Sequence, residues 1–245
     1  MAWVINREEW MNLYQGIVKP TLGRYLNLAA DQEATLVLSR ILAHKDTWVS
    51  FEEVKYSYAS YKGSVITGCA PTLLDEIAEL KKLEDTHVII AADGSAAVLM
   101  KKGVIPHVIV TDLDGPVHDI YVANRHGTII VVHAHGDNIP LLEKYVEGFP
   151  GKVTGSTQVE PAPRVYNFGG FTDGDRAAFL AYHLGFKEIV LSGFVFGEPY
   201  SCPGKLVPFN RAVKKKKLIV AKKLLSYLAN KGVVFRDIYG NALNL

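Results

Sequence analysis

Aspartates follow four separate apolar runs of this chain, and they are the residues best suited to do chemistry. They stand in the segments Asp93-Gly94-Ser95, Asp112-Leu113-Asp114-Gly115, His135-Gly136-Asp137-Asn138 and Thr172-Asp173-Gly174-Asp175-Arg176. If the apolar runs are parallel strands, their carboxyl ends meet at one edge of a sheet, which is where open α/β sheets bind ligands. Crowded carboxylates repel unless cations compensate them, and hard oxygen donors are typical of Mg²⁺ held partly through substrate phosphates. Asp137 or Asp173 taken singly could equally cap the following helix, but the four segments together predict a magnesium and phosphate site.

Two weaker signals lie near the same predicted edge. Gly68 stands in the turn Thr67–Thr72, where backbone N–H groups at the start of a helix could hold phosphate, although a tight turn explains the glycine equally well. His133 and His135 are one residue apart and therefore lie on one face if they are in a strand. A zinc site is one interpretation of this pair. The preferred interpretation of His135 is an active-site hydrogen-bond donor.

The elements that must position these residues alternate between strand and helix from Gly63 onward. Predicted strands are Ser64–Thr67, Val88–Ala92, Val108–Thr111, Thr128–His133, Val165–Phe168, Glu188–Ser192 and Val233–Arg236. Their continuous apolar character is typical of strands buried on both faces. Predicted helices are Pro71–Leu83, Ser95–Lys102, Asn138–Val146, Asp173–Leu184 and Arg211–Asn230. This order predicts an α/β fold with a doubly wound, mostly parallel sheet flanked by helices.

The remaining segments are assigned as follows. Residues 1–60 are predicted to form an N-terminal helical segment that covers the core, with Asp31 as the N-cap of one helix. Residues 61–245 are predicted to form the catalytic domain. Glu147–Arg164 and Gly197–Asn210 are rich in turn-forming residues and are predicted to be long loops, which are often functional.

Composition excludes several classes of protein. The net charge of +2 is nearly balanced and predicts no nucleic-acid partner. The run Lys214–Lys217 has the spacing of a solvated face on an amphipathic helix. No apolar run reaches the ~20 residues of a membrane span, which predicts no membrane association. Cys69 and Cys202 are too few for a disulfide framework or a thiolate metal site, and this fits a reducing, cytoplasmic location.

Three ordered segments resemble the thiamine pyrophosphokinase family. Ala92–Ala96, Gly103–His107 and Thr111–Gly115 are similar in order and approximate spacing to that family's ADGGA turn, G-x-x-P-D stretch and GDFDS loop. Thr111 and Gly115 replace the first Gly and the final Ser of the loop. Thr172-Asp173, ahead of a predicted helix, is similar to the family's TD motif.

The closer resemblance, over residues 63–200, is to the archaeal 6-hydroxymethyl-7,8-dihydropterin pyrophosphokinase (MptE-type) family. That family's DLDG loop, HGDN segment and TDGDRA helix start stand at Asp112–Gly115, His135–Asn138 and Thr172–Ala177. The resemblance implies an enzyme that transfers diphosphate from the co-substrate ATP to the hydroxymethyl group of a pterin and releases AMP. The implied context is the synthesis of methanopterin-like or folate-like cofactors.

With that activity in view, the candidate residues take expected roles. Asp112 and Asp114 hold Mg²⁺ on the ATP phosphates, while Asp137 and Asp173 complete the metal's coordination or its surroundings. Arg176 holds a phosphate through two hydrogen bonds. The other candidates are expected to contact nucleotide or pterin, and they are Gly68, Asp93, Gly94, Ser95, His135, Asn138, Thr172 and Asp175.

Three other functions stay open from the sequence alone. The acceptor can be thiamine instead of the pterin. The DLDG loop also resembles that of haloacid-dehalogenase-type phosphatases, in which the residue at Asp112 is a nucleophile and that at Asp114 a general acid. That loop normally follows the first strand of its domain, whereas here it follows the third predicted strand.

A non-catalytic nucleotide sensor needs the glycine turns but not the carboxylates. The sequence does not decide the acceptor, the number of metal ions or the oligomeric state, and a homo-oligomer is one of the states that it allows.

Overall fold

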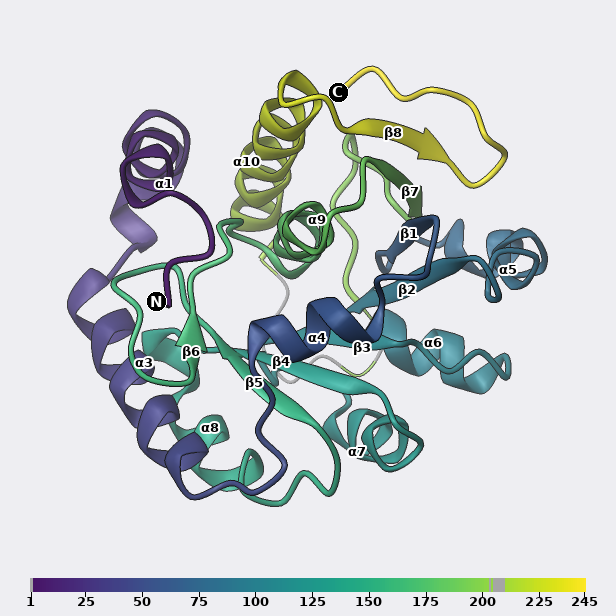
Figure 1. Cartoon of the computed structure of the whole chain (residues 1–245). Helices are drawn as coiled ribbons and strands as arrows, with labels where there is room; N and C mark the ends of the chain where they lie inside the picture. Colours follow the sequence, from purple (N-terminus) through teal and green to yellow (C-terminus); the bar gives the residue numbers. More distant parts are fainter. Residues whose placement is uncertain (1, 203, 205–209) are drawn as a thin grey trace.

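The chain is built around one eight-stranded sheet whose strands are all parallel (Figure 1). The structure is a computed structural model and describes residues 2–202, 204 and 210–245. The strand order is β6-β5-β4-β3-β2-β1-β7-β8. The strands are β1 Gly63–Thr67, β2 His87–Ala92, β3 Val108–Thr111, β4 Ile129–His133, β5 Val153–Ser156, β6 Val165–Tyr166, β7 Glu188–Ser192 and β8 Val234–Asp237.

The central strands are apolar on both sides because helices cover both faces of the sheet. In β2, Val88 and Ile90 belong to one hydrophobic cluster, and Ile89 and Ala91 belong to the other. This alternation follows from the two-residue repeat of a strand, which points successive side chains to opposite faces. The predicted doubly wound α/β fold is therefore confirmed.

The helices divide between the two faces. Residues of α1, α4, α9 and α10 belong to the first cluster, and residues of α3, α5, α6, α7 and α8 belong to the second. The α-helices are α1 Arg7–Leu13, α2 Lys19–Leu22, α3 Leu28–Ala43, α4 Phe51–Ser57, α5 Leu73–Lys81, α6 Ser95–Lys101, α7 Val117–Arg125, α8 Ile139–Tyr145, α9 Asp173–Leu184 and α10 Arg211–Asn230. A π-helix at Tyr14–Val18 and 3₁₀ turns at Gly23–Tyr25 and Gly136–Asn138 complete the helical elements. Within the described residues, none of the helices combines the length and the apolar character that crossing a membrane requires.

The chain order creates a topological switch point between β1 and β7. From β1 the chain adds strands outward in one direction as far as β6, and it then returns through α9 to place β7 on the other side of β1. On this return α9 packs across β1, β2 and β3. The N-terminus of α9, which follows the edge strand β6, is thereby brought to the carboxyl ends of the central strands. Ligand sites of open α/β sheets lie at such points.

Several predicted elements match the structure residue for residue, and others do not. The bounds of β3, β7, α9 and α10 are those predicted. The prediction that Glu147–Arg164 is a long loop is wrong, because β5 lies inside it. Helix α7 was not predicted. Of the predicted loop Gly197–Asn210, residues 203 and 205–209 lie outside the described residues.

The first sixty residues pack closely on the rest of the chain. The prediction that Asp31 is an N-cap is wrong. Helix α3 begins at Leu28, with Asn27 accepting a hydrogen bond from the Ala30 N–H as the N-cap. Asp31 is instead buried and accepts hydrogen bonds from the Gly136 N–H (2.9 Å) and from Gln158 Nε2 (2.8 Å). The N-terminal segment is thus tied directly to the turn that follows β4.

Candidate active site

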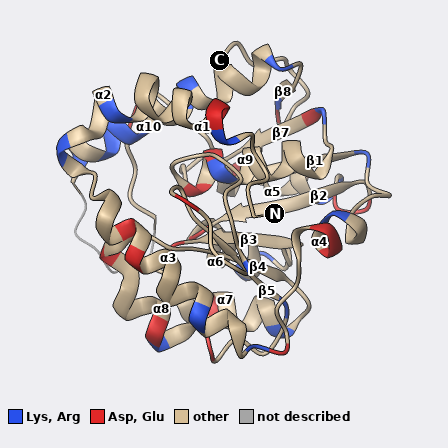
Figure 2. Cartoon of the chain, turned by 60° about the vertical axis from the view of Figure 1, so that its left-hand side comes forward, with Lys and Arg blue, Asp and Glu red and all other residues tan. Residues whose placement is uncertain are grey.

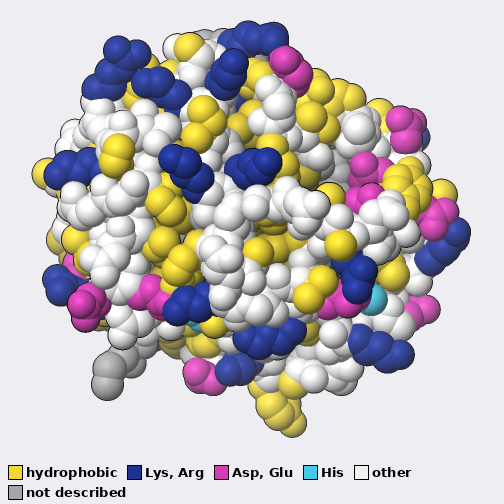
Figure 3. All heavy atoms as spheres, turned by 90° about the horizontal axis from the view of Figure 1, so that it is seen from above, with side chains coloured by type: hydrophobic (Ala, Val, Ile, Leu, Met, Phe, Trp, Pro, Cys, Tyr) yellow, Lys and Arg dark blue, Asp and Glu magenta, His cyan; other side chains and the backbone are white. Residues whose placement is uncertain are grey.

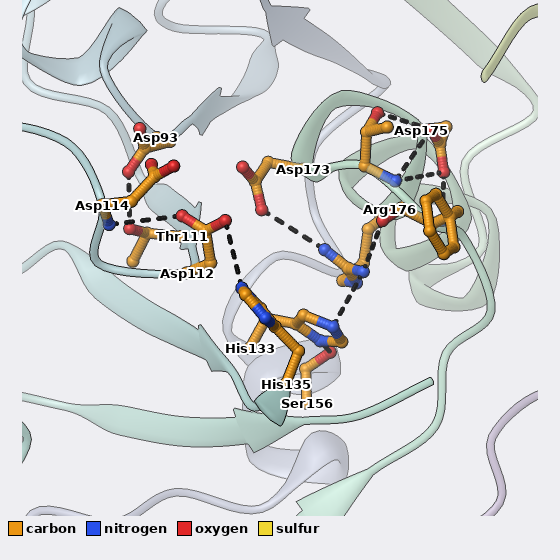
Figure 4. A network of polar contacts seen from close by, with 12 residues as sticks. Asp93, Thr111, Asp112, Asp114, His133, His135, Ser156, Asp173, Asp175 and Arg176 are labelled. Carbon is orange, nitrogen blue, oxygen red and sulfur yellow. Dashed lines mark hydrogen bonds and ion pairs between the residues drawn. The ribbon is translucent and has the colours of Figure 1, made fainter. Parts of the chain in front are cut away.

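Three carboxylates converge where β2 and β3 end. Asp93 follows β2, and Asp112 and Asp114 follow β3 (Figure 4). One ligand oxygen from each lies within 4.8 Å of the other two. Asp93 is 2% exposed, and the other two are half-buried. We call these three residues the acidic triad. Its set of carboxylate oxygens is of the kind that binds Mg²⁺.

The two loops that carry the triad are held together by Thr111. The buried Thr111 hydroxyl donates to Asp93 Oδ1 (2.7 Å) and accepts from the Leu113 N–H (2.9 Å). Asp93 (φ +43°) and Leu113 (φ +67°) both have left-handed backbone conformations, which are uncommon outside glycine and unfavourable above all for a residue such as leucine. At Gly115 a Cβ atom would lie 2.5 Å from Asp93 Oδ2, so only glycine lets the loop approach this carboxylate. Thr111 and Gly115 therefore hold the triad carboxylates in position.

A second polar group lies opposite the triad. Asp173 Oδ1 is 3.3 Å from Arg176 Nη1, and Arg176 Nη2 donates to His133 Nε2 (3.0 Å) and to the Phe171 carbonyl (2.9 Å). Figure 4 shows Asp173 between the triad and Arg176. Arg176 is only 1% exposed, and this burial lowers its pKa, while the charge of Asp173 opposes the shift. The arginine is thus a buried cation held by fixed partners.

His133 is neutral in this arrangement. Burial lowers its pKa well below the ordinary value, and the neighbouring charge of Arg176 lowers it further. Because Arg176 can only donate, His133 Nε2 must accept, and its Nδ1–H is left to donate to Ser156 Oγ (3.2 Å). A neutral histidine that accepts from arginine does not fit the alternative of a zinc site at this pair, since its Nε2 is already engaged.

His135 and Asn138 connect the β4 turn with the triad. His135 Nε2 lies 3.5 Å from Asp112 Oδ2. Asn138 Nδ2 donates to the carbonyls of Asp112 and His133, each at 2.8 Å, and its Oδ1 accepts from the His135 N–H. Asn138 is buried, so its side chain positions the loops. Asp137 is exposed and does not belong to the acidic triad.

Two further candidates are engaged in local structure. Ser95 is buried and bonds with the Thr67 hydroxyl and carbonyl. The buried Asp175 accepts from the N–H groups of Phe171 and Thr172 and from the Thr172 hydroxyl, which forms a capping box at the start of α9. Burial raises the pKa of Asp175, although these donors oppose the shift. Its role here is to fix the turn that carries Asp173.

Two recesses flank the triad. We call the first the switch-point recess, because the turns after β1 and β7 form it; its lining includes Gly68, Asp93, Phe194, Phe196 and Tyr200. We call the second the acidic recess; its lining includes Tyr25, Asn27, Asp112, Asp114, His135 and Phe171. Thr172, Asp173 and Lys214 line both recesses. Two ligands can therefore meet beside the triad.

The switch-point recess is shaped by close backbone contact between two turns. At Gly68 a Cβ atom would lie 2.6 Å from the Gly193 carbonyl oxygen. The N–H groups of Gly68 and Ala70 donate to the carbonyls of Ser192 and Gly193. These two amides are therefore not available to phosphate, contrary to the expectation for this turn.

A disulfide joins Cys69 of this turn to Cys202, and both cysteines line the switch-point recess. Gly94 lies against it, because a Cβ atom there would come 2.9 Å from Cys202 Cβ. The count of two cysteines did not predict this bond, and the bond removes the support that the cysteine count gave to a reducing location. It ties the segment after β7 to the turn after β1.

The sequence did not single out several residues that line the recesses. Tyr25, Asn27 and Gln158 line the acidic recess, and Phe194 and Phe196 line the switch-point recess. Position after a strand was the one usable signal: Phe194 and Phe196 follow β7, and Gln158 follows β5, a strand that the sequence did not predict. Tyr25 and Asn27 come from the N-terminal segment, whose packing only the structure reveals.

A family model and three curated relatives identify one family. Residues 39–200 match the family model described as "6-hydroxymethylpterin diphosphokinase MptE-like". Three relatives are named 6-hydroxymethyl-7,8-dihydropterin pyrophosphokinase. The protein from Methanothermobacter thermautotrophicus is 43% identical over 69% of this chain and 75% of its own. The protein from Pyrococcus furiosus is 42% identical over 95% of this chain and 96% of its own. The protein from Methanocaldococcus jannaschii is 38% identical over 82% of this chain and 88% of its own.

Proposed function

We infer that the chain, which belongs to the MptE-like family of 6-hydroxymethylpterin diphosphokinases, transfers diphosphate from ATP to 6-hydroxymethyl-7,8-dihydropterin and releases AMP. The observation that supports this most directly is the acidic triad between two recesses, with oxygens within 4.8 Å of one another. A transfer between two small molecules needs both of them beside one charge-neutralising centre. The product is an activated pterin for cofactor synthesis, and a cytoplasmic location fits the supply of ATP.

The triad fits Mg²⁺ by the chemistry of its donors. Asp93, Asp112 and Asp114 offer three carboxylate oxygens and no sulfur or nitrogen, which is the donor set of a hard cation. Bound Mg²⁺ would neutralise the charge of the phosphates and make the β-phosphorus a better electrophile. Asp173, beside this group and paired with Arg176, is proposed to act in its immediate surroundings.

The two substrates are assigned to the recesses by their chemistry. The switch-point recess, with Phe194 and Phe196, is proposed to take the nucleotide, as in other open α/β sheets. The acidic recess is proposed to take the pterin, since Tyr25 and Phe171 offer ring surfaces for a flat molecule and Asn27 offers hydrogen bonds to its edge. Tyr25→Ala should then raise the KM for the pterin alone, and Phe194→Ala the KM for ATP alone. The opposite pattern would reverse the assignment.

The reaction forms one P–O bond and breaks one. The hydroxymethyl oxygen of the pterin attacks the β-phosphorus of ATP. The bond from the β-phosphorus to the oxygen that joins it to the α-phosphorus breaks, and AMP leaves with that oxygen. His135 Nε2 lies 3.5 Å from Asp112 Oδ2 in the lining of the acidic recess, and we propose that this imidazole–carboxylate pair takes up the proton of the attacking hydroxyl. The Asp112 carboxylate orients the ring for this role.

A panel of acceptors tests the function. The protein is incubated with ATP, Mg²⁺ and either the pterin alcohol or thiamine, and the nucleotides are separated by chromatography. We expect AMP with the pterin and none with thiamine. Formation of AMP with thiamine but not with the pterin would identify a thiamine pyrophosphokinase. Release of inorganic phosphate from p-nitrophenyl phosphate would favour the phosphatase alternative.

A further inference from the structure

The four consecutive lysines at the start of α10 lie in three different environments. Lys214 and Lys217 line the acidic recess, and Lys214 also lines the switch-point recess. Lys216 lies over the ring of Tyr25, 5.7 Å from its centroid, and Lys215 is exposed. Figure 2 shows this basic end of α10 beside α2. The prediction of a purely solvated lysine face is therefore wrong for Lys214, which is half-buried, whereas Lys217 lines the acidic recess but is exposed.

Helical spacing explains why Lys214 faces the site. Leu218 and Ala221, at i+4 and i+7 from Lys214, also line the switch-point recess. This stripe of α10 is held against the fold, since Ala221, Leu224 and Leu225 are buried and Tyr227 stacks on Phe179 of α9 at 6.3 Å. Over the face seen in Figure 3, lysine and arginine side chains are scattered among uncharged and acidic ones. The position of Lys214 is set by a packed helix.

We propose that Lys214 binds the diphosphate group while it passes from the nucleotide to the pterin. The proposal rests on the proposed function. Lys214 is the described lysine that lines both recesses, so its ammonium can contact the same phosphates before and after the transfer. The flexible four-carbon stem of lysine suits a group that must follow a moving anion.

The charges around the site support this assignment. Asp112, Asp114 and Asp173 make the space between the recesses negative, which repels a polyphosphate in the absence of cations. Arg176 is buried, and both of its Nη atoms are engaged by Asp173, His133 and the Phe171 carbonyl. Its guanidinium is therefore better suited to orient Asp173 than to grip phosphate. Lys214, half-buried at the junction, supplies positive charge where the phosphates must lie.

Direct binding tests the proposal without any turnover. The probe is the Mg²⁺ complex of α,β-methylene-ATP, whose carbon bridge prevents transfer, and AMP is the comparison ligand; both are titrated by calorimetry. Lys214→Gln should weaken binding of the methylene analogue by about 10- to 100-fold, which is the loss expected for a charge-assisted hydrogen bond to phosphate. AMP, which lacks the β- and γ-phosphates, should bind as it does to the wild type.

Two variants control this experiment. Lys214→Arg keeps the charge and should restore most of the affinity for the analogue, and Lys215→Gln removes a neighbouring exposed charge and should change nothing. Equal affinity of Lys214→Gln and wild type for the analogue would overturn the proposal, as would an equal loss of AMP binding. Formation of AMP from ATP and pterin by the wild type is measured in parallel. If that reaction is absent while Lys214→Gln still weakens binding of the analogue, the proposed function is wrong, but the contact between Lys214 and phosphate is supported.

Discussion

Thr111 links the two halves of the acidic triad, and replacing it with valine tests that link. Valine has nearly the shape of threonine but lacks the hydroxyl. In the wild type this hydroxyl donates to Asp93 Oδ1 at 2.7 Å and accepts from the Leu113 N–H at 2.9 Å, and Thr111 and Asp93 are buried. The substitution removes one partner from a buried carboxylate and one from a buried amide.

The expected loss of stability follows from these two bonds. A buried polar group that loses its partner costs about 1–3 kcal/mol, so the loss of two such partners in Thr111→Val should lower the free energy of unfolding by about 2–6 kcal/mol. The left-handed conformations of Asp93 and Leu113 also depend on these bonds. Loss of the hydroxyl should therefore displace Asp93 and raise the Mg²⁺ concentration for half-maximal activity by at least about tenfold, as for other residues that orient metal ligands.

Thr111→Ser is the matched control because it keeps the hydroxyl and loses only a methyl group. Unfolding by urea without metal gives the free energies, and a Mg²⁺ titration of AMP formation gives the metal dependence. The reasoning is refuted if the valine variant is as stable as the serine variant and needs no more Mg²⁺. A change in stability with an unchanged Mg²⁺ requirement would mean that Thr111 supports the fold but not the triad.

Three further outcomes are expected. Asp112→Asn should lower kcat by about 10²- to 10³-fold with little change in melting temperature, and a near-wild-type rate at saturating Mg²⁺ would remove Asp112 from the site. Burial lowers the pKa of His183 from 6.5 to about 4, so between these values the unfolded chain binds a proton that the folded chain does not. The free energy of unfolding should therefore fall by about 3 kcal/mol as the pH is lowered from 7 to 4, and urea unfolding of His183→Gln should show a smaller fall. Cys202→Ser should lower the free energy of unfolding by about 2–4 kcal/mol and make it insensitive to dithiothreitol, whereas an equal stability of the wild type with and without reductant would contradict a structural disulfide.

The sequence predicted the central part of the fold because its signals there are local. Continuous apolar runs such as Val108–Thr111 mark strands that helices bury on both faces, and the run from Asp173 to Leu184 begins with a capping box that the structure contains. β5 was missed because Val153–Ser156 is short and contains a glycine, and its burial comes from neighbouring strands and α3. The role of Asp31 was missed for a similar reason, since its partners Gly136 and Gln158 are distant in sequence.

The candidate site was predictable where a residue directly follows a strand. Asp93, Asp112 and Asp114 lie together as the positions after β2 and β3 require. What the sequence could not distinguish is whether a polar side chain at the same edge faces the recess or supports the loop. Ser95, Asn138 and Asp175 are all buried in local hydrogen bonds, although their positions in the sequence resemble those of the triad.

The most direct test of the proposed reaction is the fate of a label at the β-phosphorus of ATP. ATP labelled there is incubated with Mg²⁺, the wild-type protein and 6-hydroxymethyl-7,8-dihydropterin, and the products are separated. We expect the label in a pterin diphosphate, formed in equal amount to unlabelled AMP, with no turnover by Asp112→Asn under the same conditions. Label retained in ADP, or label released as inorganic phosphate without any pterin product, would contradict the account.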